Sequence, residues 1–175
     1  MSRTRLVTRD DAPELAEVLR LNRDFLAPWE PVRSDAYFTE AGQGTVIGEA
    51  LARHDRGSSV PHVIVDDTGR IVGRIMLNGI VRGPFLSCSV GYWVAADDNG
   101  RGLATEAMAE IKHLAFEQLG LHRIEAGTLL HNAASQRVLE RNGFLRIGIA
   151  QKYLHIAGTW QDHVLFHVLN EGKTA

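Results

Sequence analysis

Hydrophobic and polar residues follow several different spacings along the chain, and each spacing predicts a different element. An apolar residue every three or four positions is typical of an amphipathic helix, whereas alternation or a short apolar run between turn residues is typical of a strand. Helical spacing occurs in four stretches. The predicted helices are one that Asp10 or Asp11 caps and Pro28 ends, one over 35–56, one from Leu103 to near Gly120, and one over 132–141.

Strand patterns occupy the middle of the chain and both of its ends. Two of them, 60–65 and 71–80, are joined by the turn sequence Asp66-Asp67-Thr68-Gly69, which is typical of a hairpin. The other predicted strands cover 3–8, 85–94, 123–129 and two segments that follow Phe144 on either side of Gly158. Antiparallel strands, then strand–helix–strand–helix and a closing hairpin, predict an α+β fold.

Composition and charge narrow the class of protein. Nineteen Lys and Arg against 21 Asp and Glu give a formal net charge of -2, which argues against binding nucleic acid through bulk charge. A single cysteine, Cys88, excludes an internal disulfide and fits a reducing compartment. The apolar stretch from Val90 to Ala96 is too short to span a bilayer, and the first residues lack the apolar core of a signal peptide. We therefore expect one cytoplasmic domain over 1–175, with no membrane and no direct nucleic-acid partner.

The histidines are the residues that could suggest a metal site. There are eight of them, and they lie at His54, His62, His113, His122, His131, His155, His163 and His167. Their spacing is not that of a zinc site, and the single cysteine excludes a cysteine cluster. We expect no metal.

A glycine-rich segment lies between a predicted strand and the helix that begins at Leu103. It consists of Asn99, Gly100, Arg101, Gly102, Leu103, Ala104 and Thr105. Glycines allow the backbone to approach a ligand closely, and the free N–H groups and dipole of a helix start favour an anion. Arg101 adds a charge that can pair with phosphate. A strand-to-helix turn without a ligand is the alternative, whereas a Rossmann site is excluded because the segment follows antiparallel strands.

A second segment, 131–144, opens a short predicted helix and ends on Asn142-Gly143-Phe144. Asn132 and Ser135 stand three residues apart at the helix start. There, each side chain can cap backbone N–H groups or reach a ligand. Spacing alone favours capping.

Together, the two segments resemble the GCN5-related N-acetyltransferase (GNAT) superfamily. Residues 99–104 match the Gln/Arg-x-x-Gly-x-Gly/Ala segment with which that family binds acetyl-coenzyme A, although Asn99 replaces the usual Gln or Arg. Residues 132–144 match its Asn-x-x-Ser and Gly-Phe segment. Further stretches look like the RimJ/RimL branch, whose best-known members acetylate the N-terminal residue of ribosomal proteins. These stretches are 22–33, 81–83, 91–92 and 158–163.

The resemblance implies a fold and a cosubstrate. The fold would be a mixed, mostly antiparallel sheet of seven strands with helices on both faces. Acetyl-coenzyme A would place its pyrophosphate at 99–105 and its pantetheine arm along a strand edge, where a bulge in that strand opens a slot. That edge would be formed by Tyr92, Trp93 and Val94, with Asn132 and Ser135 also at the site. A backbone N–H of the strand would hold the thioester oxygen, and the Ser135 hydroxyl would lie near the leaving thiolate.

The resemblance does not assign the general base. A tyrosine that many relatives carry seven residues after the helix asparagine is Leu139 here, and two glutamates of other relatives are Ser89 and Leu154. The remaining candidates for catalysis beside Ser135 are Glu30 and Tyr153. Glu30 lies in the loop that the family places at the acceptor groove, so it contacts the substrate or is an ordinary loop residue. Tyr153 lies next to the missing glutamate of the sixth strand, and the alternative is a core or rim tyrosine.

These observations predict an enzyme that moves an acetyl group from acetyl-coenzyme A to a primary amine by direct transfer in a ternary complex. An N-terminal α-amine is favoured because its pKa of about 8 leaves more of the neutral form than the lysine value of about 10.4. Acetylation of a small amine, such as an antibiotic, amino acid or polyamine, stays open, as does a coenzyme A-binding module without catalysis. A homodimer is also left open.

Overall fold

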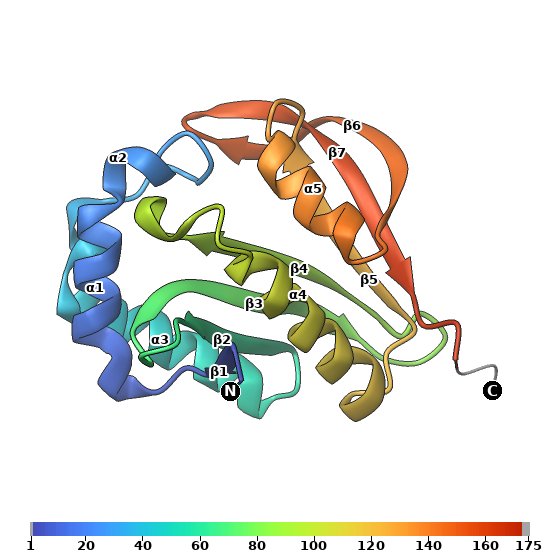
Figure 1. Ribbon diagram of the computed structural model, residues 1–175, viewed down its shortest axis with the longest axis horizontal. Helices are drawn as coiled ribbons and strands as arrows, with labels where there is room; N and C mark the ends of the chain where they lie inside the picture. The colour runs from blue at the N-terminus through green and yellow to red at the C-terminus, as the bar shows by residue number, and fades with distance from the viewer. Residues whose placement is uncertain (1, 173–175) are drawn as a thin grey trace.

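A single seven-stranded sheet forms the centre of the computed structural model, which describes residues 2–172 (Figure 1). The strands are β1 (Thr4–Leu6), β2 (Ser59–Val65), β3 (Ile71–Val81), β4 (Ser87–Val94), β5 (Arg123–Leu129), β6 (Leu145–Ile156) and β7 (Thr159–Leu169). They lie in the order β1-β2-β3-β4-β5-β7-β6, and only β4 and β5 are parallel neighbours. The predicted mixed, mostly antiparallel sheet is confirmed.

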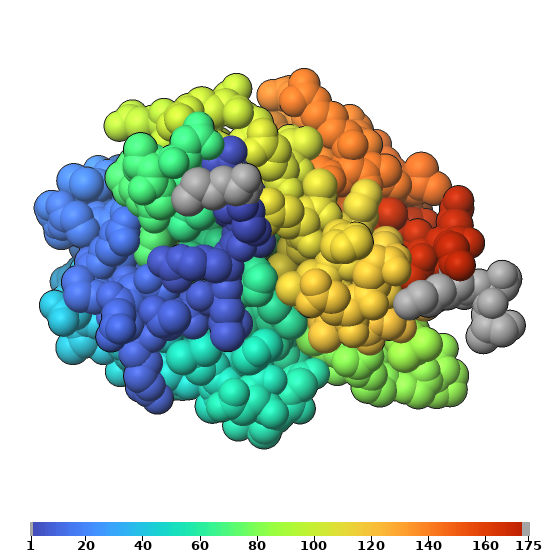
Figure 2. All heavy atoms as spheres, turned by 60° about the horizontal axis from the view of Figure 1, so that its bottom comes forward, coloured from blue at the N-terminus to red at the C-terminus, as the bar shows by residue number. Residues whose placement is uncertain are grey.

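Helices cover both faces of this sheet. They are α1 (Ala12–Leu21), α2 (Arg23–Leu26), α3 (Glu40–Asp55), α4 (Leu103–His113) and α5 (Ala133–Arg141). Helices α1 and α3 pack together on one face, and α4 and α5 pack on the other. Figure 2 shows α4 in yellow with α5 on one side and the N-terminal segment on the other. None of the helices within residues 2–172 combines the length and the apolar character needed to cross a membrane.

The hydrophobic core lies in two layers because successive strand residues point to opposite faces. Ile64 of β2 belongs to the layer under α4, whereas its neighbour Val63 belongs to the layer under α1 and α3. The first layer includes Ile75, Leu77, Met108, Ile111 and Phe166, and the second includes Val7, Leu15, Ile47 and Ile71. Helices on both faces were predicted, and each face has its own core.

Two predicted helices are broken at polar residues. The first breaks between α1 and α2 at Asn22, whose Oδ1 accepts a hydrogen bond from Ala96 N at 2.8 Å. The helix predicted over 35–56 is a 3-10 turn over Asp35–Phe38 followed by α3, with Thr39 as its N-cap. At Gly42, an added Cβ would lie 1.9 Å from Ala36 O, so only glycine allows this close approach. The continuous first helix and the continuous 35–56 helix were therefore wrong.

The strands β4 and β5 separate soon after they begin. They pair only over Ser87–Ser89 and Arg123–Glu125, and they diverge beyond that point (Figure 1). The expected bulge in β4 was wrong, because its register with β3 is regular from Ser89 to Val94 and the irregularity falls between Asn78 and Val81 of β3. Main-chain groups of β4 beyond Ser89 that face β5 are therefore left without a ladder partner.

Candidate active site

The opening between β4 and β5 leads into a cleft of about 530 Å³. Strands from β3 to β7, helix α3, the start of α5 and the loop after α2 form its walls. Five residues singled out from the sequence line it, namely Glu30, Tyr92, Trp93, Asn132 and Ser135. Segments that are far apart in the chain thus meet at one place.

At the strand opening, two hydroxyl groups lie in contact. The Ser135 Oγ is 2.7 Å from the Tyr92 Oη, which also donates to the Ser135 carbonyl oxygen at 3.2 Å. The side chain that caps α5 is that of Asn132 and not that of Ser135, because Asn132 Oδ1 accepts a hydrogen bond from Ser135 N at 3.1 Å. Burial raises the pKa of Tyr92 to about 12, so its phenol is protonated at neutral pH. This hydroxyl pair can give a hydrogen bond or a proton to an anion in the cleft.

The glycine-rich loop borders a separate hollow of about 140 Å³ at the start of α4. Gly100 and Gly102 have φ of 77° and 84°, in the left-handed region that glycine adopts at little cost. Gly102 is the N-cap of α4, so the free N–H groups of the first helical turn lie beside the hollow. The lining includes Val94, Asn99, Leu103, Ala104 and Thr105 as well. The Asn99 side chain holds the loop, because Nδ2 donates to Ala95 O at 2.8 Å.

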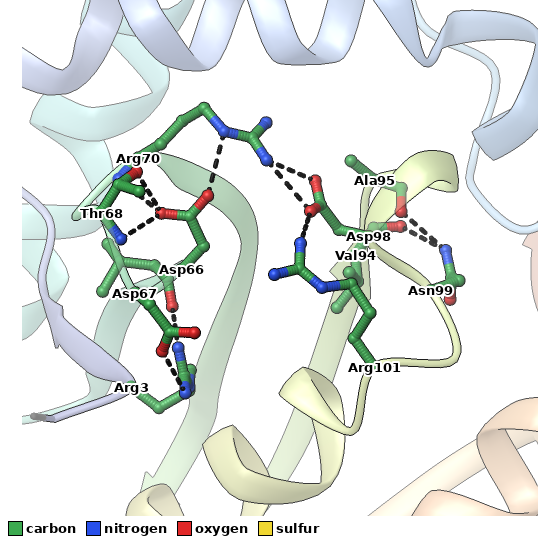
Figure 3. A network of polar contacts seen from close by, with 11 residues as sticks. Arg3, Asp66, Asp67, Thr68, Arg70, Val94, Ala95, Asp98, Asn99 and Arg101 are labelled. Carbon is green, nitrogen blue, oxygen red and sulfur yellow. Dashed lines mark hydrogen bonds and ion pairs between the residues drawn. The ribbon is translucent and has the colours of Figure 1, made fainter.

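The position of Arg101 differs from the expected phosphate contact. Its Nη1 donates to Asp98 Oδ1 at 2.6 Å, and Asp98 also accepts two hydrogen bonds from Arg70 at 3.0 and 3.1 Å (Figure 3). Asp98 is only 3% exposed, and Arg101 does not line the hollow. The Arg101 guanidinium therefore pairs with Asp98 inside the loop, and Asp98 in turn links the loop to Arg70 in the turn between β2 and β3.

Two arginines that the sequence reasoning missed lie on the other wall of the hollow. Arg137 and Arg141 are one helical turn apart on α5, and both line the hollow opposite the start of α4. Their spacing of four residues puts them on the same helix face. That spacing, directly after Ser135, was the signal available in the sequence. Two guanidinium groups facing a helix N-terminus suit a ligand with phosphates.

Glu30 lies half-buried on the wall of the large cleft. Its carbonyl oxygen accepts from Ala157 N at 2.9 Å, which ties the loop after α2 to the turn between β6 and β7. Burial raises the pKa of the Glu30 carboxyl, although the nearby cations Arg33 and Arg74 act in the opposite direction. A carboxylate with a raised pKa at such a wall can take a proton from an amine.

Tyr153, the third catalytic candidate, lies at the rim. Its side chain is 46% exposed, packs 5.6 Å from the His163 ring and does not line the cleft, whereas Leu154 and His163 do. Strand β6 loses its register with β7 between Ala150 and Leu154, and Lys152 has a φ of 47° there. This irregular stretch turns Leu154 toward the cleft and leaves Tyr153 outside.

The histidines do not gather at the cleft. His163 lines it, whereas His62 is far from it on β2, where burial lowers the pKa of its imidazole to about 4. Within residues 2–172, no group of three or more His, Cys, Asp or Glu side chains could hold a metal ion.

Comparisons of the sequence with known proteins point to one family. A family model described as an acetyltransferase (GNAT) domain matches residues 3–145. The chain is 39% identical over 163 residues to the [ribosomal protein uS5]-alanine N-acetyltransferase of Escherichia coli, across 92% of this chain and 84% of that protein. It is 37% identical over 161 residues to the probable N-acetyltransferase YjcK of Bacillus subtilis, across 91% and 89%.

Solved structures give the same result for the fold. The ribosomal-protein-S5-alanine acetyltransferase from Vibrio fischeri superimposes with a TM-score of 0.92 at 34% identity, covering 98% of this chain and 94% of that one. RimJ of Mycobacterium smegmatis in complex with CoA-disulfide gives a TM-score of 0.92 at 30% identity, covering 98% and 83%.

Proposed function

Because the chain belongs to the GNAT family of acetyltransferases, we propose that it transfers the acetyl group of acetyl-coenzyme A to the N-terminal α-amine of a ribosomal protein. The observation that carries this proposal is the contact between the Tyr92 and Ser135 hydroxyls where β4 leaves β5. Relatives at 39% and 34% identity, named for acetylation of protein S5 at alanine, support the choice of acceptor.

Acetyl-coenzyme A fits both hollows as one extended ligand. The main-chain groups of Tyr92 and Val94, which face away from β3 and have no ladder partner on β5, would hydrogen-bond the amides of the pantetheine arm, much as an added strand does. The pyrophosphate would lie at the start of α4, between its free N–H groups and the guanidinium groups of Arg137 and Arg141. The thioester would then reach the cleft beside Ser135.

The transfer itself requires two proton movements. The acceptor reacts as the neutral amine, and Glu30, directly or through a water molecule, takes one proton from its nitrogen once that nitrogen has bonded to the thioester carbon. The neutral amine nitrogen forms a bond to the thioester carbonyl carbon, while backbone N–H groups of β4 stabilise the charge that develops on its oxygen. The carbon–sulfur bond then breaks, and the thiolate accepts a proton from the hydroxyl pair of Ser135 and Tyr92. The proton that Glu30 took up replaces it through solvent, so both groups return to their starting states. Tyr153 is left to contact the acceptor from the rim.

An N-terminal α-amine is the acceptor that needs the weakest general base. Its pKa of about 8 leaves part of it neutral near neutral pH, so a single carboxylate suffices to take the one proton that the nitrogen loses during the transfer. An acceptor of this class would place the enzyme in the cytoplasm with newly made ribosomal proteins.

A thiol-release assay with acetyl-coenzyme A tests the proposal. The acceptors are peptides with the N-terminal sequence of ribosomal protein S5, the same peptides with a blocked α-amine, a lysine-containing blocked peptide, and spermidine. We expect thiol release only with the free α-amine, and mass spectrometry should place the acetyl group there. Release with spermidine alone would favour the small-amine alternative, and binding of acetyl-coenzyme A without any turnover would favour the non-catalytic module.

A further inference from the structure

A buried arginine lies at the inner end of the cleft. Arg74 is 5% exposed and stands on β3, directly opposite Trp93 of β4. Alternate residues of β3 line the cleft, namely Arg74, Met76 and Asn78, whereas the residues between them belong to the core under α4. The sheet therefore directs this side chain to the same face as Trp93, which lines the cleft together with Glu30.

The Arg74 guanidinium forms no ion pair within residues 2–172, although the Glu30 carboxyl is near enough to interact with it electrostatically. Its one hydrogen bond there runs from Nη2 to the Met76 Sδ at 3.5 Å, and no carboxylate oxygen lies within 4.0 Å of it. Each Arg74 nitrogen that lacks a hydrogen bond therefore keeps some accessible surface. The nitrogens without a protein partner therefore face the cleft.

The other arginines of the cleft already have partners. Arg53 lies 4.0 Å from Glu49, and the Arg33 guanidinium stacks 4.6 Å from the centre of the Tyr37 ring. Glu30, the other carboxyl group of the lining, has a raised pKa. An enclosed cation without a partner is costly, and an anionic ligand relieves that cost.

We propose that the Arg74 guanidinium binds a carboxylate of the acceptor, next to the amine that receives the acetyl group. The planar fork of arginine matches the two oxygens of a carboxylate, and Glu30 on the neighbouring wall receives the ammonium. The carboxylate comes either from an acidic side chain at the second residue of a protein N-terminus or from the main chain of a free amino acid. The inference rests on the proposed acetyltransferase function and narrows its substrate class.

Two matched pairs of acceptors test this inference with the unmodified enzyme. One pair is an Ala-Glu peptide and the otherwise identical Ala-Gln peptide, and the other is alanine and alaninamide. A charge-assisted hydrogen bond in an enclosed site discriminates by about tenfold or more. We therefore expect kcat/KM to be at least about tenfold higher for the acidic member of one pair, and that pair identifies the source of the carboxylate.

The variants Arg74→Met and Arg53→Met then show which arginine causes the preference for the acidic acceptor. Arg74→Met keeps the length of the side chain and should reduce the preference to within about twofold. Arg53→Met removes a paired, more exposed charge from the same cleft and should keep the preference. Binding of acetyl-coenzyme A, measured by calorimetry, shows that each variant is folded. If Arg74→Met does not fold, the comparison of acid and amide acceptors with the wild-type enzyme still tests the inference.

Three results would overturn the inference. They are equal kcat/KM for the acid and amide of both pairs, a preference that survives Arg74→Met, and an Arg74→Met variant whose pH profile shifts equally with acids and amides. The last result would mean that Arg74 acts on Glu30 rather than on the acceptor. Acetylation of acids and amides alike leaves the proposed function intact, whereas no acetylation of any acceptor overturns both.

Discussion

Replacement of Ser135 by alanine separates a catalytic role from a structural one, because the structure assigns helix capping to another residue. The cap of α5 uses Asn132 Oδ1 and the Ser135 backbone N–H, and alanine keeps that N–H. The Tyr92 hydroxyl also keeps its second acceptor, the carbonyl oxygen of residue 135 at 3.2 Å. Ser135→Ala therefore removes one hydrogen bond, worth about 1 kcal/mol. For a chain of this length, the melting temperature should fall by no more than about 4 °C.

The expected loss of turnover is much larger than this loss of stability. Removal of a group that donates a proton in the transition state lowers the rate by about 10²–10⁴-fold. We expect Ser135→Ala to lower kcat by about 100-fold while the KM for acetyl-coenzyme A changes by less than about threefold. Tyr92→Phe should cause a similar loss, and the double variant should lose little more, because the two hydroxyls 2.7 Å apart act as one unit.

Thiol release with an alanine-initiated peptide measures these rates, and thermal unfolding measures the stability. Thr39→Ala is the matched control, since it removes a helix-cap hydroxyl from α3 outside the cleft, where Thr39 Oγ1 accepts from Gly42 N at 3.1 Å. It should cost about 1 kcal/mol of stability and leave turnover unchanged. Equal turnover in Ser135→Ala and the wild type would refute the catalytic role, and fully multiplicative losses in the double variant would refute the coupling.

Three further predictions concern the hollow at the start of α4 and the proposed base Glu30. Arg137→Gln and Arg141→Gln should each weaken acetyl-coenzyme A binding in calorimetry, with a loss that shrinks at high salt, whereas Arg101→Ala should mainly lower the melting temperature because its partner is Asp98. Gly102→Ala should weaken coenzyme binding because the φ of 84° strains any residue with a Cβ, and unchanged affinity in the folded variant would exclude a phosphate contact at this loop. Glu30 acts as a base only when ionised, and its raised pKa should make the wild-type rate fall as the pH drops through that pKa. Glu30→Gln should lack this limb and need a higher pH for the same rate, so an unchanged pH profile would contradict the role.

The sequence predicted the elements that depend on local pattern. Alternation places Val63 and Ile64 of β2 on opposite faces, and both lie in the core layers that such alternation requires. The breaks in the helices could not be predicted in the same way, because they depend on contacts with distant segments. Asn22 ends α1 where its side chain meets Ala96, 74 residues later. Arg101 shows the same limit, since its partner Asp98 is also held by Arg70.

The two halves of the proposed site differ in how they are encoded, and this explains why the sequence predicted whole segments for the coenzyme but only single residues, such as Glu30, for the acceptor. The proposed coenzyme half would use backbone N–H groups, and glycines followed by a helix start indicate such groups within a few residues. The acceptor half uses side chains from separate segments, such as Glu30 after α2 and Arg74 on β3, and no short motif contains them. Changes on β3 or in the loop after α2 can therefore alter the acceptor without disturbing coenzyme binding. For this reason, residues such as Arg74 carry more information about the substrate than the segments that identify the family.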